Sequence, residues 1–138
     1  MVTKVKVQKP AIPSIVRQGA IAAGIAIVVN ALLYFIGAAL GAFPADALTP
    51  MGVPVDVTAI LGISVVATVA AIIGYFVLTR LLSVARAQQI FTIVAVLVLL
   101  GMATTPFGIT NAPMMQIVLL EVMHLVMGGA LIYFLVKA

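Results

Sequence analysis

Residues 17–41 read RQGAIAAGIAIVVNALLYFIGAALG, and this stretch decides the fold. After Arg17 it contains no charged side chain, and beyond Gln18 its only strongly polar one is Asn30. About 20 predominantly apolar residues in a row are enough to cross the roughly 30 Å hydrocarbon core of a bilayer as an α-helix. Residues 17–41 are therefore predicted to form a transmembrane helix.

Three further apolar runs of similar length follow, at residues 56–79, 88–106 and 113–136. Prolines interrupt the chain before the second and fourth runs, and proline cannot continue a helix interior; Asp56 is expected to cap the second helix. Hydrophobic residues make up 65% of the 138 residues and charged residues 7%, whereas a soluble domain carries roughly 45–50% and about 25%. The sequence predicts an all-α, polytopic membrane protein: an antiparallel bundle of four transmembrane helices over residues 17–138, preceded by a basic tail at residues 1–16.

The charged residues indicate the orientation. Four spans place every Lys and Arg on one side of the membrane, while Asp46 and Asp56 fall on the other. Basic residues favour cytoplasmic loops, so both termini are predicted to be cytoplasmic. The residues expected to set this topology and to contact lipid headgroups are Lys4, Lys6, Lys9, Arg17, Arg80, Arg86 and Lys137.

A polar layer is expected at mid-depth in the bundle. Counting inward from the span ends places Asn30, Ser64, Thr68, Glu121 and His124 at similar depth. A charged side chain at the centre of a transmembrane helix costs about 2.5–3.5 kcal/mol on insertion scales, so a retained acid calls for a partner or a role.

Glu121 and His124 are three positions apart and therefore share one helical face. Three interpretations stay open. The pair could hydrogen-bond across helices, together with Asn30, and so hold the bundle together. It could relay or donate protons. It could also face a partner subunit.

Other chemistries are constrained by what the sequence contains. A carboxylate di-metal site needs two Glu-x-x-His motifs and further acids, so no metal is predicted from the single motif of Glu121 and His124. His124 could be an axial ligand of a haem or chlorophyll-type pigment, although no cofactor is predicted outright. With no cysteine, no triad and no phosphate-binding loop in the sequence, we expect no enzyme activity. The basic residues lie beside apolar runs, so no nucleic-acid partner is expected.

Small residues within the spans allow helices to approach closely. Packing between helices of the same chain is the preferred interpretation of these glycines, and contact with a partner is the alternative. The glycines expected to pack are Gly37, Gly41, Gly74, Gly128 and Gly129.

Several short motifs resemble a known family. They are Arg80, Arg86 and Phe91 around the turn between the second and third spans, Pro106, the segment LEVMHLV at residues 120–126, and NALL at residues 30–33. From about residue 17 onward the chain resembles an uncharacterised family of small four-helix bacterial membrane proteins of Actinobacteria and Chloroflexi type. The resemblance implies four helices in the bacterial cytoplasmic (inner) membrane and brings no assigned activity.

Short loops, no soluble domain and few polar residues for a substrate path favour a non-enzymatic accessory or structural subunit of a larger membrane complex. Its expected partners are the lipid bilayer and either other membrane subunits or further copies of the chain. The alternative is a small transporter or proton-linked channel that uses Glu121 and His124, and a further alternative is a pigment- or haem-binding protein with His124 as ligand.

Overall fold

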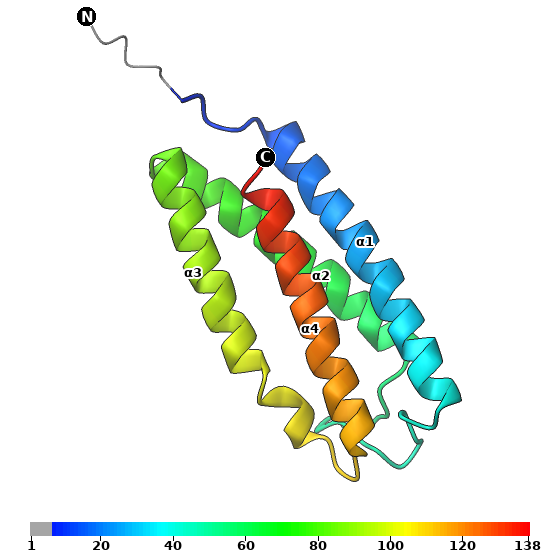
Figure 1. Cartoon of the computed structure of the whole chain (residues 1–138). Coiled ribbons are helices and arrows are strands. Elements are labelled where there is room, and N and C mark those ends of the chain that lie inside the picture. The colour runs from blue at the N-terminus through cyan, green and yellow to red at the C-terminus, as the bar shows by residue number, and fades with distance from the viewer. Residues whose placement is uncertain (1–6) are drawn as a thin grey trace, which may run out of the picture.

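The computed structural model describes residues 7–138, so Lys4 and Lys6 and their expected headgroup role lie outside the described residues. Figure 1 shows long helices running side by side, with the start of the first helix and the end of the last at the same end of the bundle. The elements are α1 (Ile12–Ala39), α2 (Val57–Leu81), α3 (Val84–Met102), the short 3-10 helix η1 (Thr105–Gly108) and α4 (Met114–Leu135). The four long helices are each long and apolar enough to cross a membrane. The predicted all-α bundle of four span-length helices is confirmed.

The first and third helices have different ends from the predicted spans, because polar residues and proline are part of the helices or lie next to them. The first helix starts at Ile12 rather than 17. Pro13 lies in its first turn, where a proline is tolerated because the backbone N–H groups there have no intrahelical acceptor. The third helix starts at Val84 rather than 88 and stops at Met102, and Pro106 instead opens η1. Apolar content marks the part of a helix within hydrocarbon, whereas the helix itself extends beyond it.

The start of α2 follows the prediction closely. Asp56 is its N-cap, and its carboxylate accepts a hydrogen bond of 2.8 Å from the backbone N–H of Ala59. This bond satisfies one of the backbone donors that a helix start leaves without an intrahelical partner. The expected capping role of Asp56 is confirmed.

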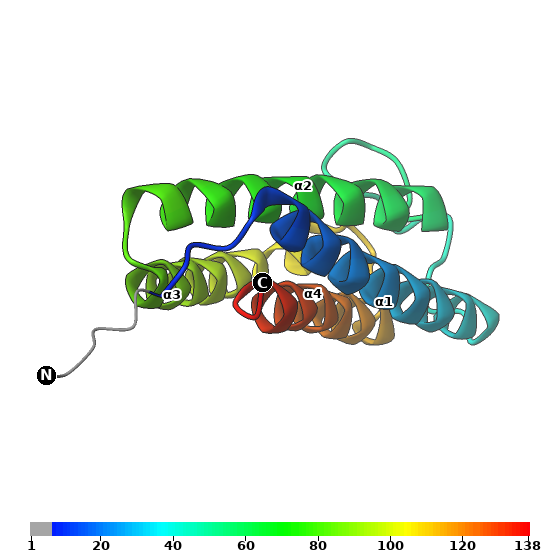
Figure 2. The same ribbon diagram turned by 90° about the horizontal axis from the view of Figure 1, so that it is seen from above.

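The helices do not pack equally. α1 lies against both α4 and α2, and Figure 2 shows α2 above α3 and α4 in that view, with α1 alongside α4. α3 buries only Ala87 and Phe91, both within its first turns. The main buried cluster joins α1, α2, α3 and α4 through Ile15, Ala22, Ala26, Tyr75, Phe91, Met127, Leu131 and Leu135.

We call the end of the bundle that carries the start of α1, the end of α4 and the α2–α3 turn the terminal end, and the opposite end the loop end. At the loop end the two connections, residues 40–56 and 103–113, are joined through Leu48 and Thr110. The N–H of Leu48 donates to the carbonyl of Thr110 at 3.1 Å, and the N–H of Thr110 donates back at 2.9 Å. Gly52 allows the turn inside the first connection, with a φ of 77°. The two loops are therefore tied to each other.

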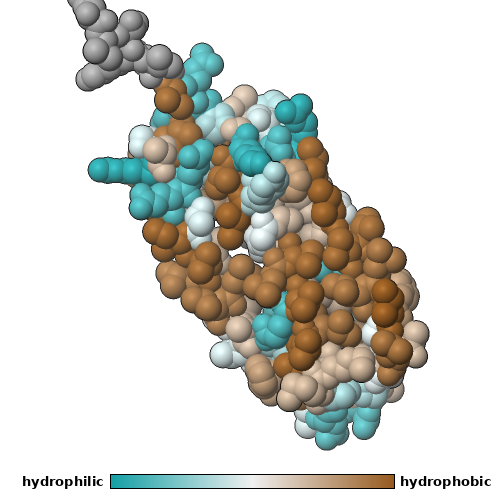
Figure 3. Space-filling model, in the orientation of Figure 1, coloured by the Kyte–Doolittle hydropathy of each residue, from teal (hydrophilic) through white to brown (hydrophobic). Residues whose placement is uncertain are grey.

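Hydrophilic surface gathers at the two ends of the molecule, with an apolar belt between them (Figure 3). Asp46 and Asp56 belong to the loop-end connection. The described basic residues belong to the terminal end: Lys9, Arg17, Arg80, Arg86 and Lys137.

Candidate functional site

Glu121 and His124 lie close together on α4 without forming a hydrogen bond. Nδ1 of His124 is 4.0 Å from Oε2 of Glu121, beyond the 2.7–3.2 Å of an N–H···O hydrogen bond. The side chains of His124 and Glu121 are 24% and 29% exposed. Oε1 of Glu121 and Nδ1 of His124 are inaccessible and have no hydrogen-bond partner among residues 7–138. The pair is present, but one buried polar atom of each side chain has no hydrogen-bond partner.

This pair belongs to the face of α4 that is turned toward α3. A Cβ placed on Gly128 would collide with the side chain of Leu99 of α3, so Gly128 marks that face. Glu121 and His124 precede Gly128 at i−7 and i−4, spacings that keep residues on one side of a helix. In Figure 3 a small hydrophilic patch interrupts the apolar belt on the face of the molecule that carries these two helices.

Asn30 contacts α4 in a different way. It is 3% exposed, and its Nδ2 donates to the main-chain carbonyl of Met123 at 3.3 Å. Its Oδ1 has no partner among the described residues. Asn30 thus lies beside the segment of α4 between Glu121 and His124, yet its amide bonds to the backbone and not to either side chain.

The hydroxyl groups of Ser64 and Thr68 form hydrogen bonds within α2. The Ser64 hydroxyl donates to the carbonyl of Ile60 at 2.7 Å, and the Thr68 hydroxyl donates to the carbonyl of Ser64 at 2.8 Å. Such bonds to the preceding turn are a common way for hydroxyl groups to be buried in a helix. The five residues of the predicted layer therefore divide into a satisfied pair on α2, a main-chain contact from α1, and the unsatisfied pair on α4.

Gln116 is a buried polar residue that the sequence interpretation missed. Its side chain is 0% exposed, and neither its Nε2 nor its Oε1 has a partner in the described part of the chain. Gln116 precedes the buried Met123 by seven residues and so continues the buried stripe of α4. That spacing is the signal that could have revealed it.

The predicted packing glycines have different surroundings. A Cβ on Gly37 would meet Leu119 of α4, as one on Gly128 would meet Leu99. Gly41 has a φ of 79° just beyond α1, and Cβ atoms on Gly74 and Gly129 would meet nothing. Gly19, which was not singled out, approaches Ile72 of α2 closely.

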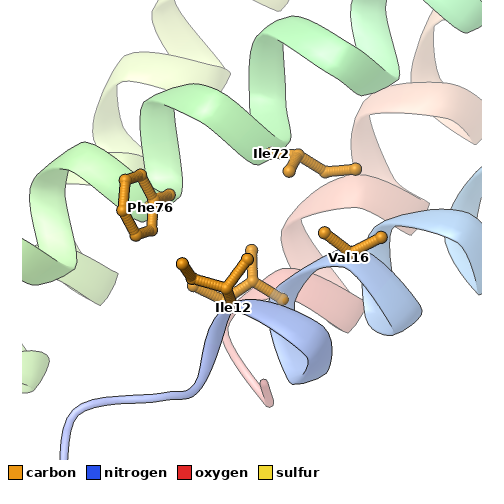
Figure 4. A pocket seen from close by; sticks show the side chains of 5 residues that line it. Ile12, Val16, Ile72 and Phe76 are labelled. Atoms are coloured by element: carbon orange, nitrogen blue, oxygen red, sulfur yellow. The ribbon is translucent and has the colours of Figure 1, made fainter.

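Two of the cavities on the described surface differ in size and lining. One, of about 150 Å³, lies between α1 and α2 and is lined by Ile12, Ile15, Val16, Ile72 and Phe76 (Figure 4). The other, of about 520 Å³, is lined by Ala85, Gln88, Gln89, Thr92, Ile93 and Val136. Neither is lined by Glu121 or His124. Within residues 7–138, no three His, Cys, Asp or Glu side chains gather to hold a metal ion.

Comparison with known proteins adds a family. No match was found among curated proteins or among solved structures. Residues 10–138 match the model of DUF6069, a family of unknown function. The expected resemblance to an uncharacterised family is confirmed. Because the match covers almost the whole chain, this four-helix protein belongs to the DUF6069 family.

Proposed function

We propose that the protein is a non-enzymatic subunit of a larger membrane assembly, and that it packs against a partner through the face of α4 that carries Glu121 and His124. One observation carries the proposal: a carboxylate and an imidazole within a span-length helix are partly exposed and unsatisfied. We call the surface formed by this face of α4 and the adjoining part of α3 the α3–α4 face.

Lipid tails cannot supply hydrogen-bond partners for Glu121 and His124. Hydrocarbon offers no donor or acceptor, so each unsatisfied polar group in the membrane costs free energy. Intramembrane ionisable residues usually face a bundle interior or a polar partner. Oε1 of Glu121 and Nδ1 of His124 are inaccessible, but the rest of each side chain is partly exposed, and a polar group from a partner helix would contact it there.

The packing of α3 supports the same face. After Phe91, no residue of α3 is buried, and of the four span-length helices α3 has the smallest buried share. α3 is therefore anchored at the terminal end and leaves most of its length available to a neighbour beside the Glu121–His124 pair.

The orientation in this proposal rests on charge. The described basic residues lie at the terminal end and Asp46 and Asp56 at the loop end, which is the distribution that favours a cytoplasmic terminal end. We place the assembly in a bacterial cytoplasmic membrane with both chain ends inside. The relay and macrocycle interpretations of the pair stay predictions.

The proposal is tested by the size of the assembly in native membranes. Tagged protein is solubilised in a mild detergent with its own lipid and run on a native gel. We expect the wild type to migrate well above the size of a single 14.3 kDa chain. The double variant Glu121→Leu with His124→Leu should fall to the single-chain size, because it removes the polar groups that the partner contacts.

A second double variant, Ser64→Ala with Thr68→Ala, is the matched control. It also removes two buried polar groups from the spans, but these bond only within α2, so the assembly should survive. A wild-type protein that runs as a single chain would overturn the proposal, as would an assembly that the Glu121 and His124 replacements leave intact.

A further inference from the structure

We infer that the terminal end carries a specific binding site for an anionic phospholipid, with an acyl chain in the cavity between α1 and α2 and the phosphate on Arg80 and Lys9. This site lies at the terminal end of α2, on the side that faces α1, and is independent of the α3–α4 face. The apolar part of the site is the cavity of about 150 Å³ shown in Figure 4.

The cavity suits a hydrocarbon chain. Ile12 and Val16 of α1 face Ile72 and Phe76 of α2 across it (Figure 4), and every lining side chain is apolar. Because the cavity is open on one side and has no polar lining group, a hydrocarbon chain can enter it without leaving a polar group unsatisfied. Ile12 and Val16 are 54% and 46% exposed, so the cavity is reached from the membrane side.

Arg80 lies at the rim of this cavity and is held in place there. Its guanidinium carbon is 4.9 Å from the centre of the Phe76 ring, which lines the cavity. Its Nη2 donates to the carbonyl of Pro10 at 2.8 Å, which ties Arg80 to the chain just before α1. A guanidinium has five N–H donors in a fork that fits phosphate, and one of them is used by Pro10.

Lys9 brings a second positive charge to the last turn of α2. Its Nζ donates to the main-chain carbonyl of Arg80 at 2.7 Å. An ammonium group has three donors, so this bond orients Lys9 and leaves donors for a ligand. Two cations from segments far apart in the sequence thus lie at the last turn of α2, one turn beyond Phe76, which lines the cavity.

No acidic side chain of the protein can neutralise them. The three acids in the sequence are Asp46, Asp56 and Glu121; the first two lie in the loop-end connection and the third lies within α4. An anion bound by these two cations therefore comes from outside the acidic side chains of the protein. Basic pockets between transmembrane helices bind anionic lipid headgroups, and a phospholipid joins the phosphate to a chain that fits the cavity.

The test uses the full-length chain in mild detergent and native mass spectrometry with two added lipids that share dioleoyl chains, phosphatidylglycerol and phosphatidylcholine. We expect the wild type to retain phosphatidylglycerol preferentially. Arg80→Gln should reduce that retention about fivefold, the factor expected for one basic residue at a lipid headgroup. Arg86→Gln, which removes the same charge at the same end but away from the cavity, should leave it unchanged.

Two more variants separate the parts of the site. Lys9→Gln changes an exposed tail residue, so it tests the headgroup contact without disturbing the helices, and it should also reduce retention about fivefold. Val16→Phe fills the cavity while every charge remains, and it should reduce the retention of both lipids.

Three outcomes would overturn the inference. Equal losses of phosphatidylglycerol retention in Arg80→Gln and Arg86→Gln would mean that the lipid is attracted by the total surface charge and not by a specific site. Displacement of phosphatidylglycerol by millimolar inorganic phosphate would mean a site for the free anion. Unchanged retention in Val16→Phe would mean that no acyl chain enters the cavity.

Discussion

Gly128 and Gly129 are adjacent in α4 and have opposite surroundings. A Cβ on Gly128 would collide with Leu99, whereas one on Gly129 would enter open space. The first glycine therefore permits the approach of α3 to α4, and the second has no such role. Both satisfy the sequence expectation of a small residue in a span, so only the rotation of α4 distinguishes them.

We predict that Gly128→Ala destabilises the protein by about 1–3 kcal/mol, the usual cost of overpacking a close contact. Gly129→Ala is the neighbouring control and should be neutral or stabilising by up to about 1 kcal/mol, because alanine is the better helix former. Thermal unfolding in detergent measures both. Equal effects of the two substitutions would contradict the assigned rotation of α4.

At the scale of the element, Phe91 is the one aromatic residue that α3 buries. Phe91 is 7% exposed, and its ring packs edge-on against Tyr75 of α2 at a centroid distance of 5.1 Å. No later residue of α3 is buried. The position of α3 against the bundle is therefore decided mainly in its first turns.

Phe91→Ala should cost about 3 kcal/mol, at the lower end of the range for Phe→Ala in protein cores, because it removes this buried ring. Phe107→Ala is the comparison: this ring, in η1, is 64% exposed and its loss should have little effect. Unfolding in detergent checks both variants. If the Phe91 variant unfolds like the wild type, α3 is held by contacts other than those described.

For the whole molecule, the distribution of charge predicts its orientation in the membrane. The sequence contains no cysteine, so single cysteines can report on each end without a background. Met51 lies in the loop-end connection and is 86% exposed, and Leu81 lies at the terminal end and is 75% exposed. Their side chains are thus accessible on opposite sides of the proposed membrane.

We predict that Met51→Cys reacts with a membrane-impermeant maleimide in sealed right-side-out vesicles, and that Leu81→Cys reacts only after the vesicles are permeabilised. The reason is the preference of basic segments for the cytoplasmic side. A gel shift of the labelled protein measures the reaction. The reverse pattern would show that the terminal end faces outward.

Much of the fold could be predicted because whether a segment can cross the hydrocarbon core depends on its own composition and length. Each span is recognised by its length and lack of charge, and prolines mark connections between spans. The helix ends were harder to predict, since Arg17 is polar but helical and η1 follows α3 where the apolar run continues. The candidate pair of Glu121 and His124 was visible for the same reason as the spans: ionisable side chains are rare within apolar runs.

The sequence by itself thus determined four span-length helices, the segregation of charge between the two ends, and the presence of polar residues at mid-depth. Only the tertiary structure decided which of those residues are satisfied: Asn30 bonds to the main chain of Met123, whereas Glu121 and His124 are left without partners. The physical reason is that these helices are apolar on every side. Such a helix has no hydrophobic stripe that indicates which face is buried. The rotation of each helix about its axis and its distance from its neighbours therefore follow from packing alone.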